Sequence, residues 1–109
     1  MRIWDISCAR LCRNHLLGEH RELHAIWSIL TKNKKGYSRH PETLRWKGKL
    51  RALYARHETL VKEMRKRGYR HLTNLPIHLA KGASQQNVFV DPYRRQLKIL
   101  KRKGCDCKI

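Results

Sequence analysis

The sequence lacks any apolar run long enough to cross a membrane, and it contains few acidic residues. A membrane span needs about 20 consecutive, mostly apolar residues, and no such run exists here. The first residues also lack the apolar core of a signal peptide. Only 8 Asp and Glu stand against 26 Lys and Arg, so the 109 residues carry a formal net charge of +18. This composition predicts a small, soluble, intracellular, single-domain protein that binds nucleic acid.

Familiar catalytic and metal-binding motifs are absent as well. The sequence contains no glycine-rich phosphate loop, no G-x-S-x-G and no H-E-x-x-H. Its cysteines, Cys8, Cys12, Cys105 and Cys107, lack the C-x2-C spacing of common zinc sites. Four thiolates can in principle share one ion, but we expect two buried or half-buried thiols early in the chain and two loose thiols in a tail.

Apolar residues at helical spacing predict a first helix from about Asn14 to Leu30, with Asn14 as its N-cap. The predicted apolar stripe consists of Leu16, Leu23, Trp27 and Leu30. His15, Glu19 and Glu22 follow at spacings of four and three and share a strip along its border. The two acids are either solvated charges that pair with nearby basic residues or functional groups at the edge of the core.

Three histidines invite a metal interpretation that helical geometry disfavours. His20 and His24 are four residues apart, but on an ideal helix they point away from the Glu19/Glu22 strip by about 100° or more. His57 lies within the apolar stripe of the next predicted helix, as a hydrogen-bonded core histidine does. The sequence therefore predicts no metal site and no cofactor.

Residues 31–40 are predicted to form a basic loop between two helices. Such a loop can lie across a phosphate backbone, or it can be a solvated connector. Its candidate DNA-contacting residues are Lys32, Lys34, Lys35, Tyr37 and Arg39.

The second helix is predicted to start at Pro41 and to end before Gly68, and a third, basic helix to run from Asp91-Pro92 to Gly104. We expect one or two helical turns near 77–80, and only 87–90 resembles a strand. The predicted fold is all-α: a compact domain of two long packed helices plus a shorter basic C-terminal helix, over residues 1–104, with a Cys-containing tail at 105–109.

A free α-amine offers a nucleophile that lysine does not match at neutral pH. Its reference pKa of about 7.7–8.0 leaves roughly a tenth of it unprotonated at pH 7, against a lysine pKa of about 10.4. Such an amine can attack a sugar C1′ and form a Schiff base, and a neighbouring carboxylate can stabilise the resulting cation.

The N-terminal part of the chain resembles the pyrimidine-dimer DNA glycosylases of the phage endonuclease V family. Met1-Arg2-Ile3 and the run from Asn14 to Leu23, NHLLGEHREL, carry the resemblance, and the end of the second predicted helix, MRKRGY, is similar too. The similarity covers roughly residues 1–76.

The resemblance implies a metal-independent glycosylase with AP-lyase activity that acts on damaged double-stranded DNA. Met1 would supply the amine that attacks C1′, and Glu22 would be the catalytic carboxylate. Arg2, His15 and Arg21 would hold phosphates near the lesion. The chain departs from the family in keeping Met1 before Arg2 and in having Ala25 at the position of a further arginine. It also lacks the family's aromatic-rich C-terminal segment.

Two other functions remain open at this stage. One is a relaxed AP lyase or DNase without selectivity for dimers, and the other is a non-catalytic basic protein that binds nucleic acid. The net charge is compatible with the glycosylase and with both of these alternatives. We expect a monomer in each case.

Overall fold

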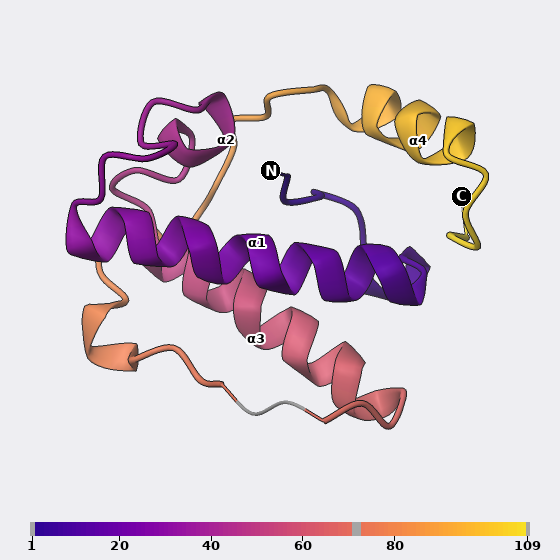
Figure 1. Cartoon of the computed structure of the whole chain (residues 1–109), viewed down its shortest axis with the longest axis horizontal. Coiled ribbons are helices and arrows are strands. Elements are labelled where there is room, and N and C mark those ends of the chain that lie inside the picture. The colour runs from indigo at the N-terminus through magenta and orange to yellow at the C-terminus, as the bar shows by residue number, and fades with distance from the viewer. Residues whose placement is uncertain (1, 71–72, 109) are drawn as a thin grey trace.

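Two long helices, α1 (Arg13–Lys32) and α3 (Leu50–Lys66), form the body of the protein. The computed structural model describes residues 2–70 and 73–108. Within them, α3 runs back along α1, and the predicted apolar stripes of the two helices meet in one core (Figure 1). Leu16, Leu23, Leu53 and Leu60 are all fully buried there. The described residues form helices and no strand, so the all-α prediction is confirmed.

The first helix is longer than predicted at both ends. It begins at Arg13 with Cys12 as the N-cap residue, so the assignment of Asn14 as N-cap was wrong. At its other end, Asn33 adopts the left-handed conformation (φ 51°) that often terminates a helix. The basic loop therefore starts at residue 33, and Lys32 lies in the last turn of α1.

The predicted second helix is broken into α2 (Pro41–Leu44) and α3. Gly48 has a φ of +75°, which interrupts the helix and turns Arg45 and Trp46 into the core. Residues 81–83 pair with the backbone at the break between α2 and α3. The carbonyls of Lys81 and Ala83 accept hydrogen bonds from the first N–H groups of α3, at 3.0 and 3.2 Å, and the Ala83 N–H donates to the Gly48 carbonyl at 3.0 Å. Donors that a helix start leaves unpaired are satisfied in this way.

Gly82 is expected to be intolerant of a side chain, because a Cβ there would lie 2.2 Å from the Gly48 carbonyl oxygen and its φ is +90°. Gly82→Ala should lower the free energy of unfolding by about 1–3 kcal/mol in urea denaturation. Gly18→Ala is the matched control, since a Cβ on Gly18, inside α1, meets nothing within 4 Å. It should raise stability by about 0.5–1 kcal/mol. Equal effects of the two changes would contradict this interpretation.

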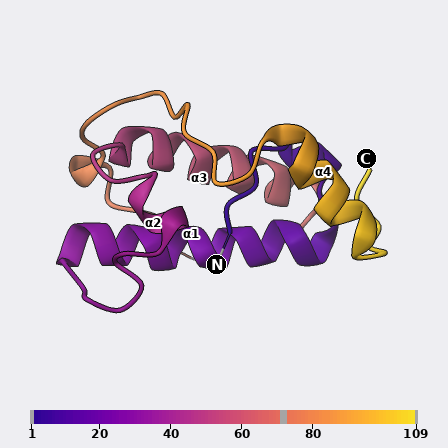
Figure 2. The ribbon, with the colours of Figure 1, turned by 90° about the horizontal axis from the view of Figure 1, so that it is seen from above.

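The C-terminal helix α4 (Tyr93–Arg102) lies beside the N-terminal residues and the start of α1 (Figure 2). Leu100 and Gln96 are the buried residues of α4, and the side-chain oxygen of Gln96 accepts a hydrogen bond from the Asp5 N–H. Residues 77–79 form one short 3-10 helix, η2 (Ile77–Leu79), and 87–90 are extended without pairing as a strand. Among the described residues, no helix is both long and apolar enough to span a bilayer.

Candidate functional site

The N-terminal segment (residues 2–6) has no helix or strand of its own, yet side chains from four parts of the fold hold its backbone. Each of four consecutive residues makes one such bond, at 2.9 Å. The bonds are Arg45 Nη2 to the Ile3 carbonyl, Trp4 N–H to Glu19 Oε1, Asp5 N–H to Gln96 Oε1, and Arg56 Nη2 to the Ile6 carbonyl. The segment is thereby fixed over the middle of α1 (Figure 1).

A buried ion pair between Glu19 and Arg56 supports this segment. Glu19 is 2% exposed, and Arg56 donates to both its carboxylate oxygens, at 2.7 and 2.9 Å. Burial raises the pKa of the Glu19 carboxyl, while Arg56 and the Trp4 N–H act against that rise. Burial lowers the pKa of Arg56, but Glu19, with smaller contributions from Cys8 and Asp5, raises it by more. Of the two acids on the predicted strip, Glu19 is therefore a structural one.

Arg56→Gln should lower the free energy of unfolding by about 3–5 kcal/mol, because it leaves the Glu19 carboxylate buried without its cation. Chemical denaturation measures the effect. Arg95→Gln is the control, since its ion pair with Asp91 is formed by a guanidinium side chain that is 70% exposed. That change should alter stability by less than about 0.5 kcal/mol. A loss at Arg56 as small as at Arg95 would show that the pair does not hold the segment.

Arg45 is a buried arginine that the sequence analysis missed. It is 5% exposed and contacts Glu42 at 2.7 Å, Asp5 at 3.1 Å and the Val88 carbonyl at 2.8 Å, in addition to Ile3. It is the C-cap residue of α2, in the break before α3. The position of Arg56 beside the core could have been predicted, because it lies three residues after Leu53 and four before Leu60, at the spacing of the α3 apolar stripe.

The predicted catalytic residues are Met1 and Glu22, and the predicted phosphate-binding residues include Arg2 and Arg21. Met1 lies outside the described residues. Glu22 is half-buried on α1, three residues after Glu19. Arg2 is paired with Asp91 at 2.9 Å and its guanidinium stacks 4.8 Å from the Trp4 ring. Arg21 is exposed on α1.

The predicted DNA-contacting residues of the 31–40 segment are all exposed. Tyr37 is 70% exposed and has a φ of 57°, unusual for a residue with a side chain. Its ring contacts that of His40, 6.4 Å away between centroids. The others are Lys32, Lys34, Lys35 and Arg39. These side chains face solvent rather than the core, as both the DNA-contact and the connector interpretation require.

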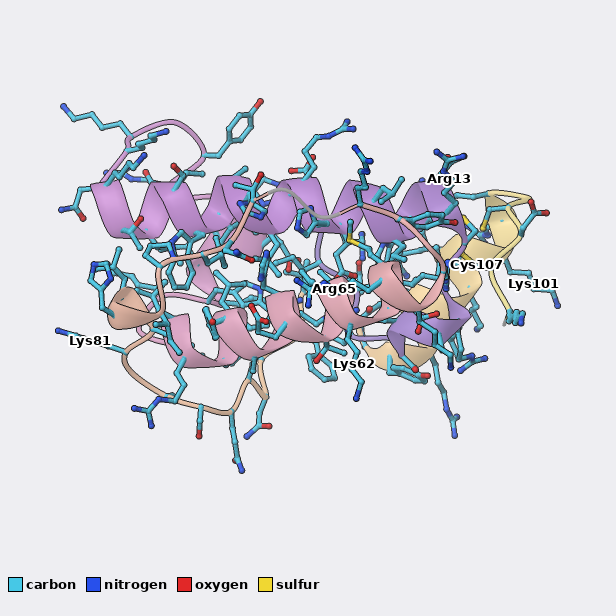
Figure 3. The ribbon with its side chains drawn as sticks, turned by 90° about the horizontal axis from the view of Figure 1, so that it is seen from below. Arg13, Lys62, Arg65, Lys81, Lys101 and Cys107 are labelled. Atoms are coloured by element: carbon cyan, nitrogen blue, oxygen red, sulfur yellow. The ribbon has the colours of Figure 1, made fainter. Side chains whose placement is uncertain are left out.

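His15 lies in a group of thiols rather than alone beside the N-terminal segment. Its Nδ1 is 3.1 Å from Cys12 Sγ and 3.4 Å from Cys107 Sγ, and its ring meets Trp4 edge-on at 5.8 Å. Cys105 completes the thiol cluster (Cys12, His15, Cys105, Cys107), in which the four ligand atoms lie within 4.8 Å of one another. The expectation of loose tail thiols was wrong, since Cys107 is buried beside the start of α1, near Arg13 (Figure 3).

The local environment shifts the titration of this cluster. Burial, together with the thiols of Cys105 and Cys12, raises the pKa of Cys107 to about 12. Burial also raises the pKa of Cys12, but hydrogen bonds with the His15 and Asn14 backbone and with the neighbouring thiols lower it by more. Burial and the charge of Lys103 lower the pKa of His15, which favours its neutral form.

A histidine cluster (His20, His24, His57) joins α1 to α3. His24 Nε2 is 3.2 Å from His20 Nε2 and 3.1 Å from His57 Nε2. The prediction of a buried, hydrogen-bonded His57 is confirmed, since its side chain is fully buried and its Nδ1 lies 3.1 Å from a Glu58 carboxylate oxygen. The sequence analysis paired His20 and His24 only with acids of their own helix, whereas the fold brings them a third imidazole from α3.

Comparison with known proteins identifies one family. A model of the pyrimidine dimer DNA glycosylase family matches residues 1–76, which include the N-terminal segment, α1, the basic loop and α3. No curated protein and no solved structure matches the chain.

Proposed function

This chain belongs to the pyrimidine dimer DNA glycosylase family, and from that membership we propose that it is a DNA repair glycosylase with AP-lyase activity. Its substrate is damaged double-stranded DNA, such as DNA with UV-induced pyrimidine dimers. The α-amine of Met1 attacks C1′ of the damaged nucleotide and releases the base. The Schiff base so formed then undergoes β-elimination, which nicks the strand. The chain needs no cofactor for this sequence and acts as a monomer inside the cell.

The fixed N-terminal segment carries this proposal. An amine nucleophile is effective only if it is held near the reacting carbon, and orientation of this kind is worth several kcal/mol of the barrier. Here four backbone bonds fix residues 3–6, and Arg2 is held by Asp91 and Trp4. Ile3, Trp4 and Ile6 of the segment are also buried in the core, so packing and hydrogen bonds together hold it in place. Its hydrogen bonds therefore support a role in presenting the residue that precedes Arg2.

Glu22 is the proposed catalytic carboxylate. It stabilises the cationic Schiff base and assists the proton transfers that accompany base release and elimination. Arg21, exposed beside it, and Arg2 bind phosphates flanking the lesion. His15 contacts the thiols through Nδ1, so Nε2 is the ring nitrogen left to donate to a phosphate. The damaged nucleotide is turned out of the stack, at a lower unstacking cost than an intact one.

Lys32, in the last turn of α1, and the basic loop that follows it are the proposed second contact with the DNA backbone. Lys32, Lys34, Lys35 and Arg39 meet phosphates, and Tyr37 stacks on an unpaired base at the distorted site. The exposure of Tyr37 in a left-handed conformation supports this role, because such backbone strain is concentrated at functional sites.

Lys34→Gln combined with Lys35→Gln should weaken DNA binding and flatten its salt dependence. Removing one phosphate-binding charge reduces the slope of log K against log salt by about 0.9, so the double change should reduce it by about 1.8. Fluorescence anisotropy with lesion-containing duplex over a range of salt measures the slope. The charge-matched control is Lys62→Gln combined with Lys66→Gln, two exposed residues of α3 (Lys62 is labelled in Figure 3). In this control the slope should stay steeper than in the Lys34→Gln, Lys35→Gln variant. Equal slopes for the two variants would exclude a special role of the loop.

Borohydride trapping tests the proposed chemistry directly. The protein is incubated with duplex DNA that carries one abasic site, without added metal ions, reduced, and mapped by peptide mass. We expect a covalent adduct on the Met1 peptide. An adduct on a lysine peptide would retain the lyase but remove Met1 as nucleophile. Tight binding without any adduct would favour the non-catalytic DNA-binding alternative.

The range of substrates separates the proposal from the relaxed AP lyase or DNase. A dimer-selective glycosylase nicks dimer-containing duplex and leaves the undamaged duplex of the same sequence intact. Cleavage of abasic DNA without cleavage of dimer-containing DNA would favour the relaxed lyase.

A further inference from the structure

We propose that Cys12, His15, Cys105 and Cys107 form a Cys3His site that binds a zinc ion. The proposal does not depend on the glycosylase chemistry. Cys3His is one of the common ligand sets of structural zinc sites. The four ligand atoms come from two places in the chain, the start of α1 and the residues after α4, and lie within 4.8 Å of one another.

The distances between ligand atoms suit a tetrahedral ion. With Zn–S near 2.3 Å and Zn–N near 2.0–2.1 Å, the N···S edge of a tetrahedron is about 3.6 Å. The observed distances from His15 Nδ1 to Cys12 Sγ and Cys107 Sγ are 3.1 and 3.4 Å. Cys12 is the N-cap residue of α1 and His15 lies three positions later, so the helix start presents both on one face.

The chain around the tail cysteines holds them in place. Gly104, with a φ of +62°, turns the chain after α4. Lys108 then exchanges hydrogen bonds with Arg10: its N–H donates to the Arg10 carbonyl, and its carbonyl accepts from Arg10 Nε, both at 2.7 Å. The Cys12 N–H donates to Cys107 Sγ at 3.0 Å, as second-sphere backbone groups do at zinc thiolates.

Charge also favours zinc at this position. Three thiolates and a divalent cation leave one net negative charge, and the surrounding chain is strongly basic. Arg13 and Lys103 line the cavity at the cluster, together with Asn14 and Asp106. Zinc there would connect the first turn of α1 to the residues after α4, which are 95 positions away, and its binding energy would add to the stability of the fold. Bound through Nδ1, His15 would keep its proton on Nε2.

Cobalt substitution tests the thiol cluster independently of activity. The full chain, reduced and titrated with Co²⁺, should bind through thiolates and develop a sulfur-to-cobalt charge-transfer absorption with intense tetrahedral ligand-field bands. Cys105→Ser combined with Cys107→Ser should lose the charge-transfer absorption. Cys8→Ala is the control, since Cys8 is buried in the core outside the cluster. This variant should retain the charge-transfer absorption. His15→Cys, which replaces the imidazole by a fourth thiolate, should retain the charge-transfer absorption and increase its intensity. This variant tests the site even if the double variant fails to fold.

Three results would overturn the zinc proposal. One is a folded wild-type protein without thiolate-to-cobalt absorption. Another is the survival of that absorption in the Cys105→Ser, Cys107→Ser variant. A disulfide among Cys12, Cys105 and Cys107 in protein prepared with reductant and zinc would be the third, because disulfide sulfurs are not available as thiolate ligands.

The histidine cluster carries a second proposal on separate observations: we infer that His20, His24 and His57 bind a divalent transition-metal ion through their Nε2 atoms. With Zn–N near 2.0–2.1 Å, the N···N edge of a tetrahedron is about 3.3 Å, and the observed distances are 3.2 and 3.1 Å. Glu58 lies 3.1 Å from His57 Nδ1. A carboxylate there holds the proton on Nδ1 and leaves the Nε2 lone pair for the metal.

This second site would lie away from the proposed DNA chemistry. On an ideal helix, His24 points about 160° away from Glu22, so the α1 backbone lies between them. Three imidazoles leave a coordination position for water or another ligand, in contrast to the closed Cys3His set. Imidazole ligands suit zinc, copper, nickel and iron.

Metal counting separates the two sites. Elemental analysis of metal-supplied wild-type protein should give about two equivalents, and His24→Gln should leave about one while retaining the cobalt–thiolate absorption. His78→Gln, an exposed histidine of η2, is the control and should keep both. Unchanged metal content in a folded His24→Gln protein would overturn the histidine site and leave the thiol site standing. His20→Asp, which keeps a ligand oxygen, gives a second measurement if His24→Gln fails to fold, and should weaken the binding rather than abolish it.

Discussion

Glu22→Gln should reduce strand cleavage at a lesion by roughly 10²–10⁴-fold, the usual contribution of a positioned acid–base group. The amide keeps the size of the side chain but cannot stabilise the cationic Schiff base or take up a proton. Among the residues that the structure describes, no ion pair ties Glu22 to the fold as Arg56 ties Glu19, so DNA affinity and stability should stay close to those of the wild type. Single-turnover cleavage, fluorescence anisotropy and chemical denaturation measure the three quantities.

Glu19→Gln is the matched control for this prediction. The two acids lie three positions apart on one helix, but Glu19 is 2% exposed and paired with Arg56. Its change should lower the free energy of unfolding by about 3–5 kcal/mol, because Arg56 loses its buried anion. If Glu22→Gln reduced stability and cleavage together, as Glu19→Gln should, Glu22 would be a structural residue and the assigned chemistry would be wrong.

Acetylation of the α-amine should abolish both base release and strand cleavage. An amide nitrogen has no lone pair available to attack C1′, so no Schiff base forms. The modification removes at most one positive charge, in addition to which the side chains carry a formal net charge of +18, and we expect DNA binding to change little. Site-selective acetylation at Met1, with mass spectrometry to verify the site, and cleavage of abasic duplex measure the effect.

Reductive methylation distinguishes loss of the nucleophile from loss of charge. A dimethylated α-amine keeps its charge when protonated but cannot form a stable imine, so it should be as inactive as the acetylated one. An acetylated protein that still nicks abasic DNA would exclude the Met1 amine, and trapping would then have to locate another nucleophile.

The sequence predicted the helical framework because local patterns specify it. The α1 and α3 stripes recur at three and four residues, and Pro41 and Gly104 mark real boundaries. The break at Gly48 was harder to predict from the sequence. A single glycine costs a helix only about 1 kcal/mol, and what decides the break is the contact with residues 81–83, which no local pattern contains.

The candidate site was only partly predictable for the same reason. His15, Glu19 and Glu22 were identified as one strip, but helical periodicity does not say which acid is buried. The ion pair with Arg56, on α3, determines that Glu19 is the buried acid. The thiol cluster unites residues 95 positions apart, and the histidine cluster unites two helices. Spacing within one segment cannot reveal either arrangement, because each ligand set is completed by tertiary packing.

The hydrogen bonds of the N-terminal segment also have a consequence for biosynthesis. The segment is the first part of the described chain to leave the ribosome, yet its partners follow at positions 19, 45, 56 and 96. The bond from Asp5 to Gln96 spans 91 residues. In a nascent chain, the bond to Glu19 can therefore form early, whereas the bond to Gln96 can form only after α4 has been made. The last of the four bonds of the segment that is synthesised first thus depends on a helix that is synthesised near the end.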